Sequence, residues 1–92
     1  MASGSKRGIR FSSSAWEHYQ YWMVQDKATL KRINTLITDC LRDPYNGIGK
    51  PEPLKHEFSG WWSRRIDQEH RLVYRLREDT LEIAALRYHY GE

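Results

Sequence analysis

The 92 residues suffice for one domain with a modest core, and 39% hydrophobic and 13% aromatic residues exclude an intrinsically disordered chain. One cysteine, Cys40, excludes an internal disulfide, and no apolar run approaches the roughly 20 residues of a membrane span. We therefore expect a cytoplasmic protein without a membrane segment, whose net charge of +3 is compatible with a polyanionic partner. Residues 1–7 are expected to form a flexible N-terminal extension, and residues 8–92 a single domain.

The domain begins with signals for a strand and a helix. Alternating apolar and polar residues predict a short strand over residues 8–12. A helix over residues 14–25 follows, for which Ser12, Ser13 and Ser14 are candidate N-caps. If Ser14 is the cap, Glu17 three residues later completes a capping box.

A second helix is predicted immediately after the first. Asp26 is its expected N-cap, and Asp43 ends it because Pro44 disfavours helical backbone at the residue before it. With almost no loop between them, the two helices should form a helical hairpin. The apolar stripe of the second helix recurs at helical spacing: Leu30, Ile33, Leu36, Ile37, Cys40 and Leu41.

The second half of the chain changes from helical period to strand period. A loop rich in Gly and Pro covers residues 44–53, and short polar breaks then separate runs that alternate like antiparallel strands. We predict an α+β fold in which the helical hairpin covers one face of a mainly antiparallel sheet, leaving the other face for a site. The predicted strands are residues 54–58, 61–67, 70–77 and 80–90.

Glu52 stands out because Pro51 and Pro53 flank it. Pro53 restricts Glu52 to extended conformations, and Pro51 does the same to Lys50. This stiffness reduces the entropy lost when one carboxylate is presented at a fixed place. An ordinary solvated loop carboxylate is the alternative.

Alternation along the strands also predicts which side chains share a face. Arg65, Arg71 and one of residues 88–90 could lie close together on neighbouring strands, and a bulge near the end of the last strand would exchange its faces. Arg64 and Arg65 either bind RNA or are solvated on their strand. Trp61 and Trp62 should point to opposite faces, one of them into the core.

Some of these polar residues have simpler interpretations. Arg71 could pair with Asp67 or Glu69 as a surface ion pair that contributes little stability. The histidines outside the Tyr88-His89-Tyr90 run are interpreted as structural or surface residues: His18, His56 and His70.

Four motifs together resemble the YoeB family of bacterial toxins, within the RelE-like superfamily of type II toxin–antitoxin systems. They are AWEHYQYW (15–22), KRINTLITDCLRDPYNGIGKPEPLKH (31–56), GKPEPLKHEFSGWWSRRIDQEHRLVYRL (49–76) and RYHY (87–90). The resemblance implies a small RelE-like domain that cleaves mRNA in the A site of the 70S ribosome. It further implies a homodimer and a YefM-like antitoxin that silences it.

Carried over residue by residue, the resemblance implies a general base at Glu52, a phosphate-stabilising arginine at Arg71 and a general acid at His89. It also implies positions that bind phosphate or frame the site: Lys55, Arg65 and Tyr90. The family pattern ends at the tyrosine of YHY, whereas Gly91 and Glu92 follow here and add a negative charge near the expected site.

These residue types suit metal-free RNA cleavage. The RNA 2′-hydroxyl is the nucleophile, so the protein must supply a base for its proton, cations for the phosphorane and an acid for the departing 5′-oxygen. No Cys/His cluster with zinc spacing is present in the sequence, so neither metal nor cofactor is expected. The alternative is a module of the same fold that binds the ribosome or the antitoxin without catalysis.

Overall fold

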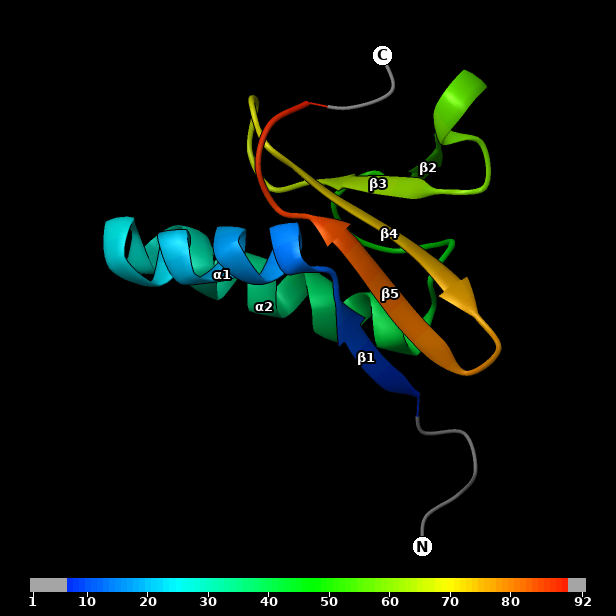
Figure 1. The fold of residues 1–92 in the computed structure, drawn as a ribbon, viewed down its shortest axis with the longest axis horizontal. Coiled ribbons are helices and arrows are strands. Elements are labelled where there is room, and N and C mark those ends of the chain that lie inside the picture. Colours follow the sequence, from blue (N-terminus) through cyan, green and yellow to red (C-terminus); the bar gives the residue numbers. More distant parts are fainter. Residues whose placement is uncertain (1–6, 90–92) are drawn as a thin grey trace, which may run out of the picture.

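The computed structural model describes residues 7–89 and places two helices against one face of a five-stranded sheet (Figure 1). Residues 1–6 of the predicted extension lie outside this range, and so do Tyr90, Gly91 and Glu92. Arg7 lies inside it, where its Nη1 donates to the carbonyl oxygen of Leu41 at 2.6 Å. Neither helix of the described part of the chain is long and apolar enough to cross a membrane.

Helix α1 (Ser13–Gln25) begins one residue before the predicted start. Of the three candidate serines Ser12 is the N-cap, and its Oγ accepts from the Ala15 N–H at 3.0 Å, so the capping box that depended on Ser14 does not form. The sheet explains the shift, because the Ser12 N–H donates to the carbonyl of Ile83 and its Oγ to that of Ala84. Ser12 is thereby held in extended conformation, and the helix can begin directly after it.

Helix α2 (Lys27–Arg42) follows with only Asp26 between the helices. The Asp26 carboxylate accepts from the N–H groups of Ala28 and Thr29 at 3.1 and 3.2 Å, which confirms the predicted N-cap and hairpin. The helix ends at Asp43, as the following proline predicts.

The sheet has the order β1-β5-β4-β3-β2. Strand β1 runs parallel to β5 and every other neighbouring pair is antiparallel, which confirms the predicted α+β architecture. The strands are β1 (Gly8–Phe11), β2 (Glu52–Pro53), β3 (Trp62–Arg65), β4 (Arg71–Arg77) and β5 (Thr80–Ala85).

The strand predicted over residues 54–58 is wrong. Strand β2 contains Glu52–Pro53 alone, and a single 3₁₀ turn, η1 (His56–Phe58), replaces the rest. His56 has a φ of 58°, in the left-handed region that extended strands do not visit, and the Phe58 N–H closes the turn on the Lys55 carbonyl at 3.1 Å.

The main core lies between the helical hairpin and one face of the sheet. The stripe of α2 supplies four buried residues, and β4 and β5 contribute the facing apolar side chains. A smaller apolar cluster lies on the opposite face, where Phe58 and Trp61 pack against Leu54, Val73 and Ala85. Trp62 packs on the main core, which confirms that the two tryptophans point to opposite faces.

Gly49 allows the loop before β2 to pass close to α2 and β3. Its φ is +80°, and an added Cβ would lie 2.8 Å from Leu36 Cδ2 and 3.2 Å from Arg64 Cβ. We expect Gly49→Ala to lower the free energy of unfolding by about 2–4 kcal/mol, because it combines an unfavourable φ with overpacking. Gly60→Ala is the matched control, since Gly60 also has a positive φ but has no atom within 4 Å of an added Cβ. Equal losses in urea denaturation of the two variants would contradict the packing explanation.

Candidate active site

Strand register places three of the expected site residues on one face of the sheet. Glu52 pairs with Ser63, and Arg65 pairs with Arg71. Directly paired residues of antiparallel strands project to the same side, and Ser63 and Arg65 are two residues apart on β3. Glu52, Arg65 and Arg71 therefore share a face. It is the face away from the helices, because Val73, which pairs with Ser63, belongs to the small cluster on that side.

Glu52 is presented at the edge of the sheet on a stiff segment. Its side chain is exposed, and strand pairing with Ser63 holds its backbone. The next backbone anchor is the Leu54 N–H, which donates to the carbonyl of Trp61 at 2.8 Å. On the other side Lys50 has a φ of 53°, so the prediction that Pro51 holds Lys50 in extended conformation is wrong. This left-handed conformation costs free energy, which the contacts of the surrounding loop must offset.

A buried arginine imposes the shape of that loop. Arg64 is fully buried, and its Nη1 donates to the Asp39 carboxylate at 2.6 Å. Its guanidinium also donates to three loop carbonyls, those of Asp43 (2.6 Å), Asn46 (3.2 Å) and Ile48 (3.1 Å). The loop that leads to Glu52 is thus tied to the middle of β3.

Tyr74 completes this network. Arg64 Nε donates to the Tyr74 hydroxyl at 3.1 Å, and that hydroxyl donates to the carbonyl of Pro44 at 2.6 Å. Both interpretations of Arg64 from sequence, RNA binding and a solvated strand position, are therefore wrong. Strand alternation could have identified this buried position, since Arg64 points to the face opposite Arg65, the face that also carries Trp62 and Ile66.

The network also sets the ionisation of its members. The hydrogen bond from Arg64, followed by that from Arg42, lowers the pKa of Asp39 from 3.8 to about 2. Burial raises the pKa of the Cys40 thiol to about 11, in keeping with the predicted role of Cys40 as a core residue.

Asp39 should make the stability of the protein sensitive to acid. Its pKa is lower in the folded chain than in the unfolded chain, so its contribution is present above pH 4 and is lost as the pH falls toward 2. We expect the free energy of unfolding, measured by denaturant titration at several pH values from 5 to 2, to fall more steeply for the wild type than for Asp39→Asn. Equal slopes for the two proteins would exclude Asp39 as a source of the acid sensitivity.

Arg71 is held by backbone carbonyls. It is only 9% exposed, and its Nη1 donates to the carbonyls of Asp67 (2.9 Å), Gln68 (3.4 Å) and His70 (3.2 Å) in the β3–β4 turn. Within residues 7–89 it forms no ion pair, so the interpretation of Arg71 as a surface ion pair is wrong. Carbonyl oxygens orient the guanidinium without neutralising its charge, which leaves that charge available to an anion.

The C-terminal segment reaches the same region by a bulge. Val73 pairs with Ala85 and Tyr74 with Ile83, so Ala84 is the extra residue of a bulge, which exchanges the faces of the strand end. The last strand ends at Ala85, not at residue 90 as predicted, and residues 86–88 form bends.

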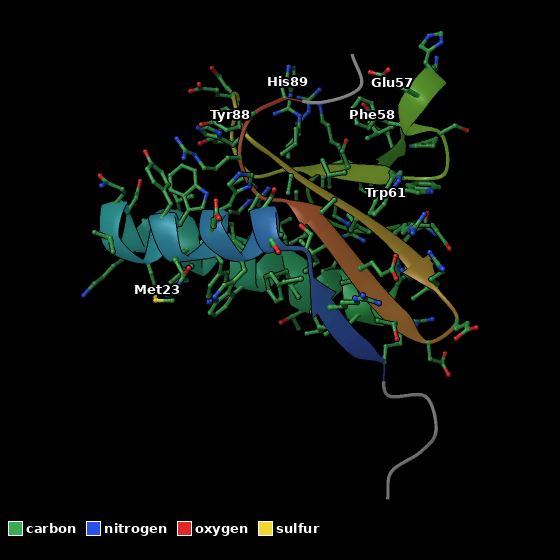
Figure 2. All side chains as sticks on the ribbon, viewed as in Figure 1. Met23, Glu57, Phe58, Trp61, Tyr88 and His89 are labelled. Atoms are coloured by element: carbon green, nitrogen blue, oxygen red, sulfur yellow. The ribbon has the colours of Figure 1, made fainter. Side chains whose placement is uncertain are left out.

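His89 lies beside Arg71 in the backbone arrangement. The Arg71 N–H donates to the carbonyl of Tyr88 at 3.0 Å, directly before His89. Figure 2 shows His89 at the same end of the molecule as Phe58 and Glu57, above the sheet and far from Met23 on α1. Lys55, like His89, is exposed, and it stands at the start of η1 three residues after Glu52. Tyr90 lies outside the described residues.

Comparison with known proteins identifies relatives over most of the chain. A family model described as the YoeB-like toxin of bacterial type II toxin–antitoxin systems matches residues 11–90. Toxin YoeB of Escherichia coli is 58% identical over 80 residues, which cover 87% of this chain and 95% of that protein. Toxin YoeB of Streptomyces coelicolor is 56% identical over 82 residues, which cover 89% and 98% of the two chains.

Solved structures agree with the sequence relatives. A YoeB dimer from Staphylococcus aureus superposes with a TM-score of 0.86 at 44% identity, covering 92% of this chain and 99% of that one. YoeB in a heterotetrameric YoeB–YefM toxin–antitoxin complex from the same organism gives a TM-score of 0.84 at 45% identity, covering 91% and 98%. The resemblance drawn from the sequence motifs is confirmed, and the chain belongs to the YoeB-like family of toxins of bacterial type II toxin–antitoxin systems.

Proposed function

We propose that this toxin is a ribosome-dependent endoribonuclease that cleaves mRNA in the ribosomal A site. The observation that supports the proposal is that Glu52, Arg65 and Arg71 share one open face of the sheet. The C-terminal segment, which contains His89, is hydrogen-bonded to Arg71 beside this face. Metal-free RNA cleavage by attack of the 2′-hydroxyl on phosphorus needs a base, cations and an acid. A carboxylate, two guanidinium groups and an imidazole can fill these roles. The site would act in the cytoplasm, where ribosomes translate.

In the proposed reaction Glu52 takes the proton of the 2′-hydroxyl as its oxygen attacks phosphorus. Arg71, with support from Lys55 and Arg65, stabilises the negative charge that builds up on the phosphorane. His89 then gives a proton to the departing 5′-oxygen as the P–O5′ bond breaks. The products are a 2′,3′-cyclic phosphate and a 5′-hydroxyl. Tyr90 is assigned to frame the site on the family pattern alone.

The antitoxin partner is proposed from chemistry and from relatives. The open face carries exposed Lys55 and Arg65, together with Arg75, whose guanidinium lies 4.3 Å from the ring centroid of Trp61. An acidic, partly disordered segment of a YefM-like antitoxin could cover this face and become ordered on binding. The Staphylococcus aureus YoeB–YefM complex supports the partner, and the YoeB dimer from that organism supports a homodimer here.

Mapping of mRNA 5′ ends tests the activity. Purified toxin added to a translating extract should generate new 5′-hydroxyl ends at codons in the A site, and none on the same mRNA without ribosomes. Arrested translation without new ends would overturn the proposal in favour of a module that binds the ribosome without cleaving mRNA.

A further inference from the structure

Two histidine rings hold the backbone that leads to His89. His18 comes from α1 and His70 from the turn before β4, and both are partly buried. The Leu86 N–H donates to His18 Nδ1 at 3.0 Å, and the Tyr88 N–H donates to His70 Nδ1 at 2.8 Å. These two N–H groups belong to residues 86–88, which follow β5 and form bends instead of a strand.

Such hydrogen bonds require neutral imidazoles. A ring nitrogen accepts only through a lone pair, so the single proton of each neutral ring must be on Nε2. Protonation places a second N–H at Nδ1, where it faces another donor. The hydrogen bond to the backbone is then replaced by a repulsive contact between two N–H groups.

The surroundings of His18 favour its neutral form. Burial first, and then the Arg87 guanidinium, lower the pKa of His18, with a smaller contribution from His70, whereas Glu17 raises it. The Tyr88 ring also contacts His18 edge to face, at 5.9 Å between centroids. Because folding lowers this pKa, neutral His18 stabilises the fold above pH 6.5, and its contribution is lost as the pH falls through the lower folded value.

The groups around His70 belong to the turn that holds Arg71. Glu69 Oε1 lies 3.6 Å from His70 Nε2, and the Asp67 carboxylate accepts from the His70 N–H at 2.7 Å. The His70 carbonyl accepts from Arg71 Nη1, and the ring lies edge to face with that of Trp22 at 5.0 Å. His70 therefore links the expected phosphate-binding arginine to the segment that carries the expected acid.

The held segment is strained next to His89. Tyr88 has a φ of 70°, which a bulky residue adopts only when its surroundings impose it. Trp22 Nε1 donates to the Leu86 carbonyl at 2.8 Å, and the Arg87 guanidinium lies 3.6 Å from the centroid of Tyr21. Each of these contacts offsets part of the strain. Loss of the His70 acceptor would remove the hydrogen bond that holds Tyr88, which directly precedes His89.

We infer that His18 and His70 form a histidine latch: as hydrogen-bond acceptors they position the backbone of residues 86–88, and thereby His89, for catalysis, and protonation of His18 releases the Leu86 N–H. Both are positioning residues, since neither is assigned a contact with RNA. The catalytic consequence rests on the proposed function, whereas the opening of the latch can be measured without it.

Hydrogen exchange of the wild-type protein is the first test. Lowering the pH from 7.5 to 5.5 should reduce the protection factor of the Leu86 amide, whose acceptor is His18, by about tenfold, after correction for intrinsic exchange rates. The Leu72 amide, in the β3–β4 pairing, should keep its protection. Unchanged protection of Leu86 at the lower pH would overturn the role of His18 in the latch.

Substitution of His70 tests its hydrogen bond to the Tyr88 N–H. Asparagine can place its Oδ1 where histidine has Nδ1, so His70→Asn should keep the Tyr88 amide protected. His70→Ala should expose that amide by about tenfold already at pH 7.5. His56→Asn, at an exposed position of η1, is the histidine control. Equal Tyr88 protection in His70→Ala and the wild type would contradict the role of His70.

Single-turnover cleavage on programmed ribosomes measures the consequence for activity. His70→Ala should reduce the cleavage rate about tenfold with little change in the toxin concentration at half-saturation, because the acid is misplaced while the binding face is intact. His70→Asn should restore the rate. Absence of cleavage by the wild type would refute the proposed function and leave the exchange result standing, whereas full activity of His70→Ala would refute the catalytic role of the latch.

Discussion

Replacing Glu52 with glutamine is expected to lower the rate of mRNA cleavage on translating ribosomes by about 10²–10⁴-fold. Glutamine has nearly the same shape and leaves both flanking prolines and the pairing of β2 with β3 intact. Only the ability to take a proton from the 2′-hydroxyl is lost. The measurement is single-turnover cleavage of an mRNA in the A site, with the thermal midpoint of unfolding recorded for each protein.

Glu78→Gln is the matched control, because Glu78 is also an exposed glutamate but lies in the turn between β4 and β5 (Figure 1). His89→Ala should cause a loss comparable to that of Glu52→Gln. The double variant should be little slower than either single variant, since base and acid act in one step and their effects do not add. Cleavage by Glu52→Gln at the wild-type rate would remove Glu52 from the mechanism.

The helical half of the fold was predictable because its boundaries depend on local chemistry. Asp26 caps α2 and Asp43 ends it before a proline, and neither needs a distant partner to do so. The start of α1 was less predictable for the opposite reason. Ser12 is chosen over Ser14 by hydrogen bonds to β5, about 70 residues further along the chain.

The positions of the strands and of the site residues depend more on how the strands pair than on the alternation of residues within each strand. Alternation placed Arg65 and Arg71 correctly as neighbours, since each falls on a regular stretch of its strand. It failed at β2, where the positive φ of His56 closes a 3₁₀ turn. A histidine is tolerated there, but nothing in the sequence requires that conformation.

The sequence did not identify the residues that hold the segments carrying the site residues. His18 and His70 have no motif spacing, and the bulge at Ala84 decides which backbone N–H groups face them. Strand alternation places Arg64 on the apolar face of its strand, but an arginine at such a position is readily interpreted as exposed to solvent. Its partners come from α2 and from the loop after it, so the network exists only once the hairpin has packed on the sheet.

Replacing Arg64 with alanine is expected to lower the free energy of unfolding by about 3–5 kcal/mol. The substitution removes a fully buried side chain and leaves Asp39 without its 2.6 Å partner. The carbonyls of Asp43 and Ile48 also lose a donor. Arg64→Lys should recover only part of the loss, because one ammonium cannot reach Asp39, the loop carbonyls and the Tyr74 hydroxyl together. Denaturant titration at neutral pH provides the measurement.

Arg65→Ala, one residue away, separates stability from activity. Arg65 is exposed on the face of Glu52, so its loss should change the free energy of unfolding by only about 0.5 kcal/mol while it slows cleavage. Arg64→Ala should slow cleavage as well, but through the loop, because residues 43–50 no longer hold Glu52 in place. Near-normal cleavage by folded Arg64→Ala, at a temperature well below its unfolding midpoint, would show that the two prolines alone suffice to position the carboxylate. A joint loss of activity and stability would instead establish that the stiffness of the Pro51-Glu52-Pro53 segment is useful only when a buried arginine anchors the loop before it.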